Sequence, residues 1–173
     1  MTLAADTPTA KLALTDKDFR IIGTIARSNR QIALVSKNHQ INNVEDLIGK
    51  RVGIVPNTTS EYFIHALLTH QNINPKKMTF INIAPHEAEE ALDKAKVDVV
   101  SVWQPIIYRI EKKHKNQISK FYGPDFYNHT WNILIRPELM DNPDLLTRFI
   151  KALAEANDFF KKNPETSIQT ASK

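Results

Sequence analysis

The feature that most constrains this chain is the alternation of strand-like and helix-like hydrophobic patterns along nearly its whole length. Short apolar runs predict strands, and apolar residues spaced three and four apart predict helices. Because the two kinds of segment follow one another, the pattern predicts an α/β fold with a mainly parallel sheet. The predicted strands are 19–26, 31–36, 51–55, 78–83, 97–102, 116–121 and 130–135, and the predicted helices are 44–48, 59–71, 88–95, 105–113, 142–162 and a last short one from 164.

Length and composition limit the class of protein. A chain of 173 residues, 42% of them hydrophobic and 24% charged, can form one ordinary domain or two small lobes with a real core. The absence of cysteine excludes disulfides, thiolate zinc sites and cysteine nucleophiles. The net charge of +4 is scattered, and the densest basic stretch, 112–115, is typical of a solvated helix end. We therefore expect no nucleic-acid partner.

The location is only partly readable from the sequence. No apolar run reaches the roughly 18 residues that a membrane span requires. Residues 1–10 lack a basic start followed by an apolar stretch, so we expect no signal peptide in this chain. A cytosolic protein and a mature or truncated extracytoplasmic one both remain open.

Polar residues follow the predicted strand 51–55 at the start of the next helix. In open α/β sheets ligands bind beyond the carboxyl ends of strands, and a helix start offers unpaired N–H groups and a partial positive charge. Thr58, Thr59 and Ser60 therefore predict a pocket for an anion such as a sulfonate, carboxylate, phosphate or nitrate. Alternatively, Thr58 and Glu61 form a capping box that only satisfies the helix.

Two further segments are candidates for the same site. Trp103 and Gln104 end a buried strand just before a helix, where an indole would offer a flat apolar wall and one N–H donor. Alternatively, Trp103 is a core residue. Asp6 and Thr7 precede Pro8 at another helix start, although the pattern alone favours an ordinary helix cap there. Trp131, within a predicted strand, is either core or cleft.

No pattern supports catalysis. The six histidines form no metal-ligand set, no Ser lies in a Gly-x-Ser-x-Gly turn, and no carboxylate pair is marked as acid and base. The four glycines match neither a phosphate loop nor a dinucleotide-binding fingerprint. The residues therefore do not support an enzyme, and we expect neither a cofactor nor a metal.

Several segments, in order, resemble one family. From 46–54 onward the chain is similar to the solute-binding proteins of ABC importers for nitrate, taurine, aliphatic sulfonates and thiamine-precursor pyrimidines. The similarity runs from about residue 2 to residue 165. It rests on the short helix ending in Gly49-Lys50, the polar helix start 58–63, the connection 74–78, the segment 88–102, the Trp103-Gln104-Pro105 element and the loop 4–8.

This resemblance implies a two-lobe, type II periplasmic-binding-protein fold that traps a small solute between its lobes. It implies a complete second lobe at 32–122 and, because the family's opening strand, helix and strand are missing, an incomplete first lobe made of 1–31 and 123–173. The implied ligand contacts are Asp6, Thr7, Thr58, Thr59, Ser60, Trp103 and Gln104.

The resemblance also implies partners and a location. The partners would be a small-molecule ligand and an ABC permease, and the location would be periplasmic or otherwise extracytoplasmic. Gln104 stands where the family commonly has a glutamate and Ile106 where it has an aromatic, so the ligand class stays open. An incomplete lobe would expose apolar surface, so we expect the chain either to pair with a copy of itself or to hold ligand weakly.

Two other functions are known for similar folds. The same lobes serve as ligand-sensing domains of membrane signalling proteins, in which case a signalling module replaces the permease. Related pyrimidine synthases share the fold but need a cysteine-rich motif, which this cysteine-free chain lacks.

Overall fold

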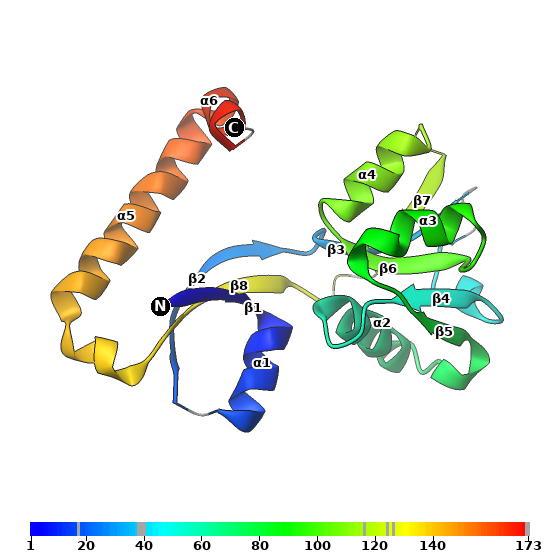
Figure 1. Cartoon of the computed structure of the whole chain (residues 1–173), viewed down its shortest axis with the longest axis horizontal. Helices are drawn as coiled ribbons and strands as arrows, with labels where there is room; N and C mark the ends of the chain where they lie inside the picture. Colours follow the sequence, from blue (N-terminus) through cyan, green and yellow to red (C-terminus); the bar gives the residue numbers. More distant parts are fainter. Residues whose placement is uncertain (17, 38–40, 116, 124, 126, 172–173) are drawn as a thin grey trace.

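The fold contains two β-sheets, of unequal size, that the chain builds from different parts of the sequence (Figure 1). It was obtained as a computed structural model that describes residues 1–16, 18–37, 41–115, 117–123, 125 and 127–171. The larger sheet comes from the middle of the chain, and the smaller one comes from its two ends.

The larger sheet has five strands in the order β5-β4-β6-β3-β7. Strand β4 pairs in parallel with β5 and β6, whereas β3 pairs antiparallel with β6 and β7. The strands are β3 (Ile32–Lys37), β4 (Arg51–Ile54), β5 (Thr79–Asn82), β6 (Val99–Trp103) and β7 (Ile118–Phe121).

Helices cover both faces of this sheet (Figure 1). Helix α2 (Thr59–His70) lies on one face, and α3 (Ala88–Asp93) and α4 (Ile106–Lys113) lie on the other. Successive strand residues point to opposite faces, so Leu34 packs in the α2 core and Val35 in the α3–α4 core. Three short 3₁₀ turns complete the connections: η1 (Glu45–Leu47), η2 (Pro75–Lys77) and η3 (Pro85–Glu87).

The smaller sheet is antiparallel, with β8 (His129–Ile135) between β1 (Thr2–Ala5) and β2 (Arg20–Ser28). Helix α1 (Asp6–Thr15) follows β1 directly and contacts β8. The chain passes between the sheets twice, once between β2 and β3 and once between β7 and β8.

The C-terminal helices project from the rest of the fold (Figure 1). After the turn η4 (Pro137–Asp141), the 20-residue helix α5 (Pro143–Lys162) contains no buried residue, and α6 (Pro164–Ala171) follows it. The apolar stripe of α5 faces β2 and β8 across a groove of about 380 Å³. Among the described residues, no helix has the length and apolarity needed to cross a bilayer.

Most of the predicted elements are present, and two expectations fail. The sheet is not mainly parallel: the described strands make two parallel and four antiparallel pairings. The first residues, expected as a loop before a helix, form strand β1. Asn116, the start of one predicted strand, lies outside the described residues, and that strand is seen as β7.

Gly53 in β4 is closely surrounded by side chains of the core of the larger sheet. A Cβ atom there would come within 2.9 Å of Ile83 Cδ1 and 3.1 Å of Val100 Cγ1. We predict that Gly53→Ala lowers the free energy of unfolding by about 1–3 kcal/mol through overpacking. Gly23→Ala is the control, because its Cβ would meet only Ile133, at an ordinary 3.5 Å. Equal urea midpoints for the two variants would refute the packing argument.

The exposed apolar stripe of α5 predicts association of the 173-residue chain with itself. Ile150 is 44% exposed on this stripe, and Ile48, on the larger-sheet side, is 45% exposed. We expect sedimentation velocity to show concentration-dependent dimers that Ile150→Glu weakens about tenfold or more, since a charge replaces buried apolar area. Ile48→Glu should leave association unchanged, and a monomer at all concentrations would contradict the prediction.

Candidate functional site

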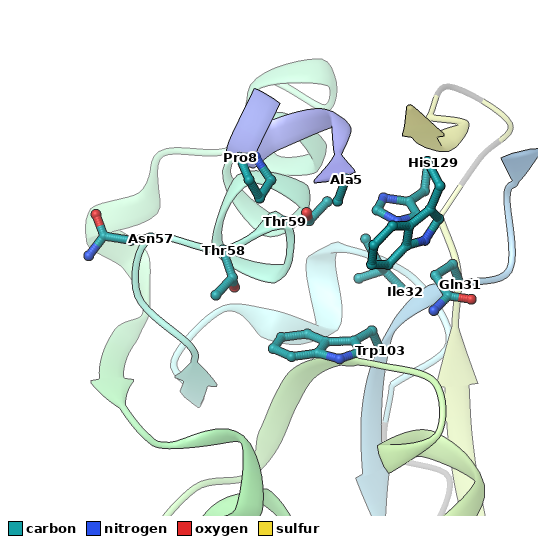
Figure 2. A pocket seen from close by; sticks show the side chains of 10 residues that line it. Ala5, Pro8, Gln31, Ile32, Asn57, Thr58, Thr59, Trp103 and His129 are labelled. Atoms are coloured by element: carbon teal, nitrogen blue, oxygen red, sulfur yellow. The ribbon is translucent and has the colours of Figure 1, made fainter. Parts of the chain in front are cut away.

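A pocket of about 220 Å³ lies where the two sheets meet (Figure 2). It is smaller than the roughly 300–1,000 Å³ typical of drug-sized ligands, so its volume suits a small solute. Figure 2 shows the Trp103 ring across the pocket from Ala5 and Pro8. The lining residues come from both sheets and their connections: Ala5, Pro8, Gln31, Ile32, Asn57, Thr58, Thr59, Trp103, His129 and Trp131.

The start of helix α2 forms one wall of the pocket. Thr58 is the N-cap: its hydroxyl donates to the carbonyl of Val55 at 2.7 Å and accepts from the N–H of Ser60 at 3.3 Å. The Glu61 carboxylate turns back to accept the N–H of Asn57 at 2.6 Å. Thr58 therefore caps the helix, but the expected capping box is met only in part, because Thr58 accepts from Ser60 and Glu61 accepts from Asn57. These bonds occupy the side chains of Thr58 and Glu61.

Thr59 differs from its neighbours because its hydroxyl is not used by the helix. The residue is only 7% exposed and lines the pocket, yet within the described part of the chain no hydrogen bond engages its hydroxyl. It lies in the first turn of a twelve-residue helix, where backbone N–H groups lack intrahelical partners. A ligand oxygen here would meet an unused hydroxyl and a partial positive charge.

Two tryptophans contribute apolar walls from different sheets. Trp103 ends β6, as predicted, and packs partly against both cores of the larger sheet. Trp131 lies in β8, is 39% exposed and lines the pocket, so it belongs to the cleft and not to the core. Its ring meets the His129 ring edge-on, with centroids 5.8 Å apart.

The Asp6 carboxylate is the centre of a polar cluster behind the pocket. It accepts from the Tyr127 hydroxyl at 2.6 Å, the N–H of Thr7 at 2.7 Å and the N–H of Thr130 at 3.3 Å. The Nδ1 atom of His129 lies 3.3 Å from Asp6 Oδ1, the oxygen that also accepts from Thr7. These contacts join the start of α1 to the start of β8.

The cluster changes the acidity of its members. Burial raises the pKa of Asp6, but hydrogen bonds from His129, Tyr127 and Thr7 outweigh this and leave the pKa below its ordinary value. Burial, with the neighbouring Asp6 carboxylate, raises the pKa of the Tyr127 phenol well above its ordinary value. Asp6 therefore stays ionised and Tyr127 stays a donor at neutral pH.

Of the seven residues predicted as ligand contacts, three line the pocket: Thr58, Thr59 and Trp103. The other four lie beside it: the carboxylate of Asp6 is in the polar cluster, with Thr7 donating to it. The Ser60 hydroxyl lies 3.1 Å from that of Thr58, and the Gln104 side chain accepts the N–H of Tyr108 at 3.2 Å.

His129, Gln31 and Asn57 line the pocket without having been predicted. His129 carries no local signal, because a histidine within a strand pattern identifies neither a cleft nor a partner. Asn57 has a sequence signal, because it adjoins the predicted helix start. In the structure its φ is 61°, a left-handed conformation that Asn tolerates. Its side chain accepts from Lys11 of α1 at 2.8 Å, which links the two sides of the pocket.

Two larger hollows are less suited to a solute. The groove of about 420 Å³ between α3 and α4 is lined by charges that pair with one another. There Lys113 lies 2.6 Å from Glu89 and 2.7 Å from Asp93. The groove beside α5 is apolar and offers little for recognition of a polar solute.

Comparison with known proteins assigns the chain to a family. The model of the NMT1/THI5-like family matches residues 2–167. The chain belongs to the NMT1/THI5-like family. The resemblance found in the sequence to importer solute-binding proteins is thereby confirmed.

Individual relatives agree with this family. The NMT1/THI5-like chain is 26% identical over 147 residues to the taurine-binding periplasmic protein of Escherichia coli K12, covering 82% of the chain and 44% of that protein. It superimposes on the periplasmic aliphatic sulphonate binding protein SsuA of E. coli with a TM-score of 0.79 and 17% identity. That match covers 98% of this chain and 59% of SsuA. The alkanesulfonate-binding protein SsuA of Xanthomonas axonopodis pv. citri, bound to MOPS, superimposes with a TM-score of 0.73 and 16% identity. That match covers 97% of this chain and 58% of the Xanthomonas protein.

These likenesses confirm the fold class and the class of protein. The NMT1/THI5-like chain has the α/β fold of periplasmic binding proteins, spans about half the length of the curated relatives it matches, and belongs with binding proteins, not enzymes. The relatives are named as periplasmic, in agreement with the predicted extracytoplasmic location.

The Asp6 cluster predicts a pH-dependent share of stability. Because the pKa of Asp6 is lowered in the folded state, its contribution is complete above about pH 4 and is lost as pH falls through the folded pKa. We predict that Asp6→Asn costs about 1–2 kcal/mol of unfolding free energy at pH 7, from lost charge-assisted hydrogen bonds, and less at pH 3. Urea unfolding of both proteins from pH 7 to pH 3 measures the gap. A gap that stays constant or widens would contradict the assignment.

Proposed function

We propose that this chain forms the ligand-binding part of a periplasmic solute-binding protein that delivers a small anionic solute to an ABC permease. The observation that carries the proposal is the unused Thr59 hydroxyl at the start of α2, facing a pocket with tryptophan walls from both sheets. Such a site can hold a polar head at the helix start and an apolar body between the rings.

The proposal includes the division of the chain into lobes. Residues 32–122 would be the complete second lobe, and residues 1–31 and 123–173 would be part of the first. The two buried core clusters support this division, because all their buried members fall between Ile32 and Ile118. The pocket lies between the sheets of the two parts, where closure about the two crossings would enclose a solute.

The ligand class follows from the chemistry of the lining. Among the described residues, no Asp, Glu, Lys or Arg side chain lines the pocket. This lining disfavours a cationic solute and leaves the helix start as the main source of positive potential. The relatives named for taurine and aliphatic sulphonates support a sulfonate of a few carbons. The permease partner rests on the family alone, since the chain covers only part of each relative.

A thermal-shift screen tests the proposal. The panel holds nitrate, taurine, short alkyl sulfonates, phthalate-like acids, bicarbonate, pyrimidines and polyamines. A ligand at 100 times its Kd stabilises by about 2.7 kcal/mol, which raises Tm by a few degrees. We predict that a small anion raises Tm. Thr59→Val should raise the Kd for that anion roughly tenfold or more, because a hydrogen bond to a charged group is lost.

Matched variants control for general damage. Trp103→Ala should also reduce the shift, whereas Thr69→Ala and Tyr108→Ala should not. Thr69 lies at the other end of α2, where its hydroxyl donates to the carbonyl of His65, and Tyr108 is 53% exposed on α4. A shift caused only by polyamines, or one insensitive to Thr59 and Trp103, would refute the anion site.

A further inference from the structure

Tyr127 contacts elements on both sides of the pocket without lining the pocket itself. It is half-buried in the crossing between β7 and β8. Its ring packs against the core beneath α2, which belongs to the larger sheet, and its hydroxyl reaches Asp6, at the start of α1 beside the smaller sheet. One side chain therefore joins the two parts of the fold that build the pocket.

The ring of Tyr127 lies against the start of α2. Its centroid is 5.6 Å from that of Tyr62 and 6.1 Å from that of Phe63, and Phe63 is only 2% exposed. These two residues follow Thr59 by three and four positions, and residues at that spacing share one face of a helix. The ring therefore packs on the helix face that begins with Thr59.

The hydroxyl of Tyr127 reaches the opposite wall of the pocket. It donates to Asp6 Oδ2 at 2.6 Å, a length typical of donation to an ionised carboxylate. Asp6 directly follows Ala5, which lines the pocket from the end of β1. The same carboxylate oxygen accepts the N–H of Thr130, next to the lining residue Trp131 in β8. The hydroxyl is thus tied to both strands that carry this wall.

A second bridge between the two sides is weaker. Lys11 donates to Asn57 at 2.8 Å, but this bond is exposed to solvent and joins a flexible side chain to a neutral amide. Water competes for both groups, so the bond contributes little. The bond from Tyr127 to Asp6 is partly buried and charge-assisted, so it is the stronger constraint on the separation of the walls.

We propose that Tyr127 is a positioning residue that holds the start of α2 against the smaller sheet and so sets the separation of the pocket walls. This inference rests on the proposed function and adds the residue that determines which length of solute the pocket selects. Tyr127 acts through its neighbours: its ring acts on the turn that carries Thr59, and its hydroxyl acts on the opposite wall through Asp6. Loss of the hydroxyl releases the ring from Asp6 and lets the walls move apart.

The test compares ethanesulfonate with butanesulfonate by isothermal titration of the purified protein. Tyr127→Phe keeps the ring and removes the hydroxyl. It should weaken ethanesulfonate about tenfold, because binding of a short solute must restore an arrangement that the lost charge-assisted bond had held. It should weaken butanesulfonate much less, because a longer chain still reaches both walls when they lie further apart.

Tyr122→Phe is the matched control. Tyr122 lies in the same crossing, but it packs on the α3–α4 core, and the Arg30 guanidinium lies over its ring at 5.2 Å. Phenylalanine keeps both contacts, so the affinities for the two sulfonates should stay as in the wild type. Circular dichroism confirms that each variant is folded.

Two further readouts separate positioning from general stability. In the ligand-free protein, the amide ¹H–¹⁵N signals of residues 59–63 should move in Tyr127→Phe and stay in place in Tyr122→Phe. The loss of ethanesulfonate affinity caused by Tyr127→Phe should disappear in an Asp6→Ala background, because the hydroxyl then has no carboxylate to hold.

The outcomes distinguish this inference from the function beneath it. Wild-type protein that binds neither sulfonate overturns the proposed sulfonate site and the selection of solute length, whereas amide signals that move only in Tyr127→Phe still support the positioning of α2. Amide signals that stay in place in Tyr127→Phe overturn the positioning role. Equal losses of affinity for the two sulfonates overturn the selection of length, because they show general damage and not a wider pocket.

Discussion

The Asp6 carboxylate is the contact on which the geometry of the smaller sheet and the pocket depends. The larger sheet is enclosed by two buried clusters, whereas beside the smaller one the apolar core is thin and α5 contributes no buried residue. Asp6 accepts hydrogen bonds from the Tyr127 hydroxyl and the N–H of Thr130, which lie 121 and 124 positions further along the chain. Hydrogen bonds to an ionised, half-buried carboxylate are stronger than neutral ones, so a few of them fix the start of α1 against β8.

The larger sheet supplies the rigid side of the site. Trp103 ends β6, and Thr59 begins the helix that follows β4. Both strands are buried in the core of the larger sheet, so packing sets the positions of these two residues. Lys11 and Asn57 then connect this side to α1 at 2.8 Å. A solute in the pocket would touch residues of both sheets, and its binding energy would favour the arrangement that brings them together.

The sequence predicts those parts of the fold and the site that depend on local patterns. Thr59 and Trp103 were found because a strand end followed by a helix start is visible in a few residues. The direction of the strands was not predicted correctly, because the two-residue period is the same in parallel and antiparallel sheets. Strand β3, for example, pairs antiparallel with β6. His129 was missed because its partner, Asp6, is brought to it only by the pairing of β1 with β8.

The central claim is that one pocket, built by both sheets, takes one small anion. The chain has two tryptophans, Trp103 in the larger sheet and Trp131 in the smaller, and both line the pocket. Their indole N–H signals in a ¹H–¹⁵N NMR titration with ethanesulfonate therefore report on the site from both sides. The account predicts that both signals shift along one binding curve with a single Kd. Movement of only one signal, or two different dissociation constants, would contradict it.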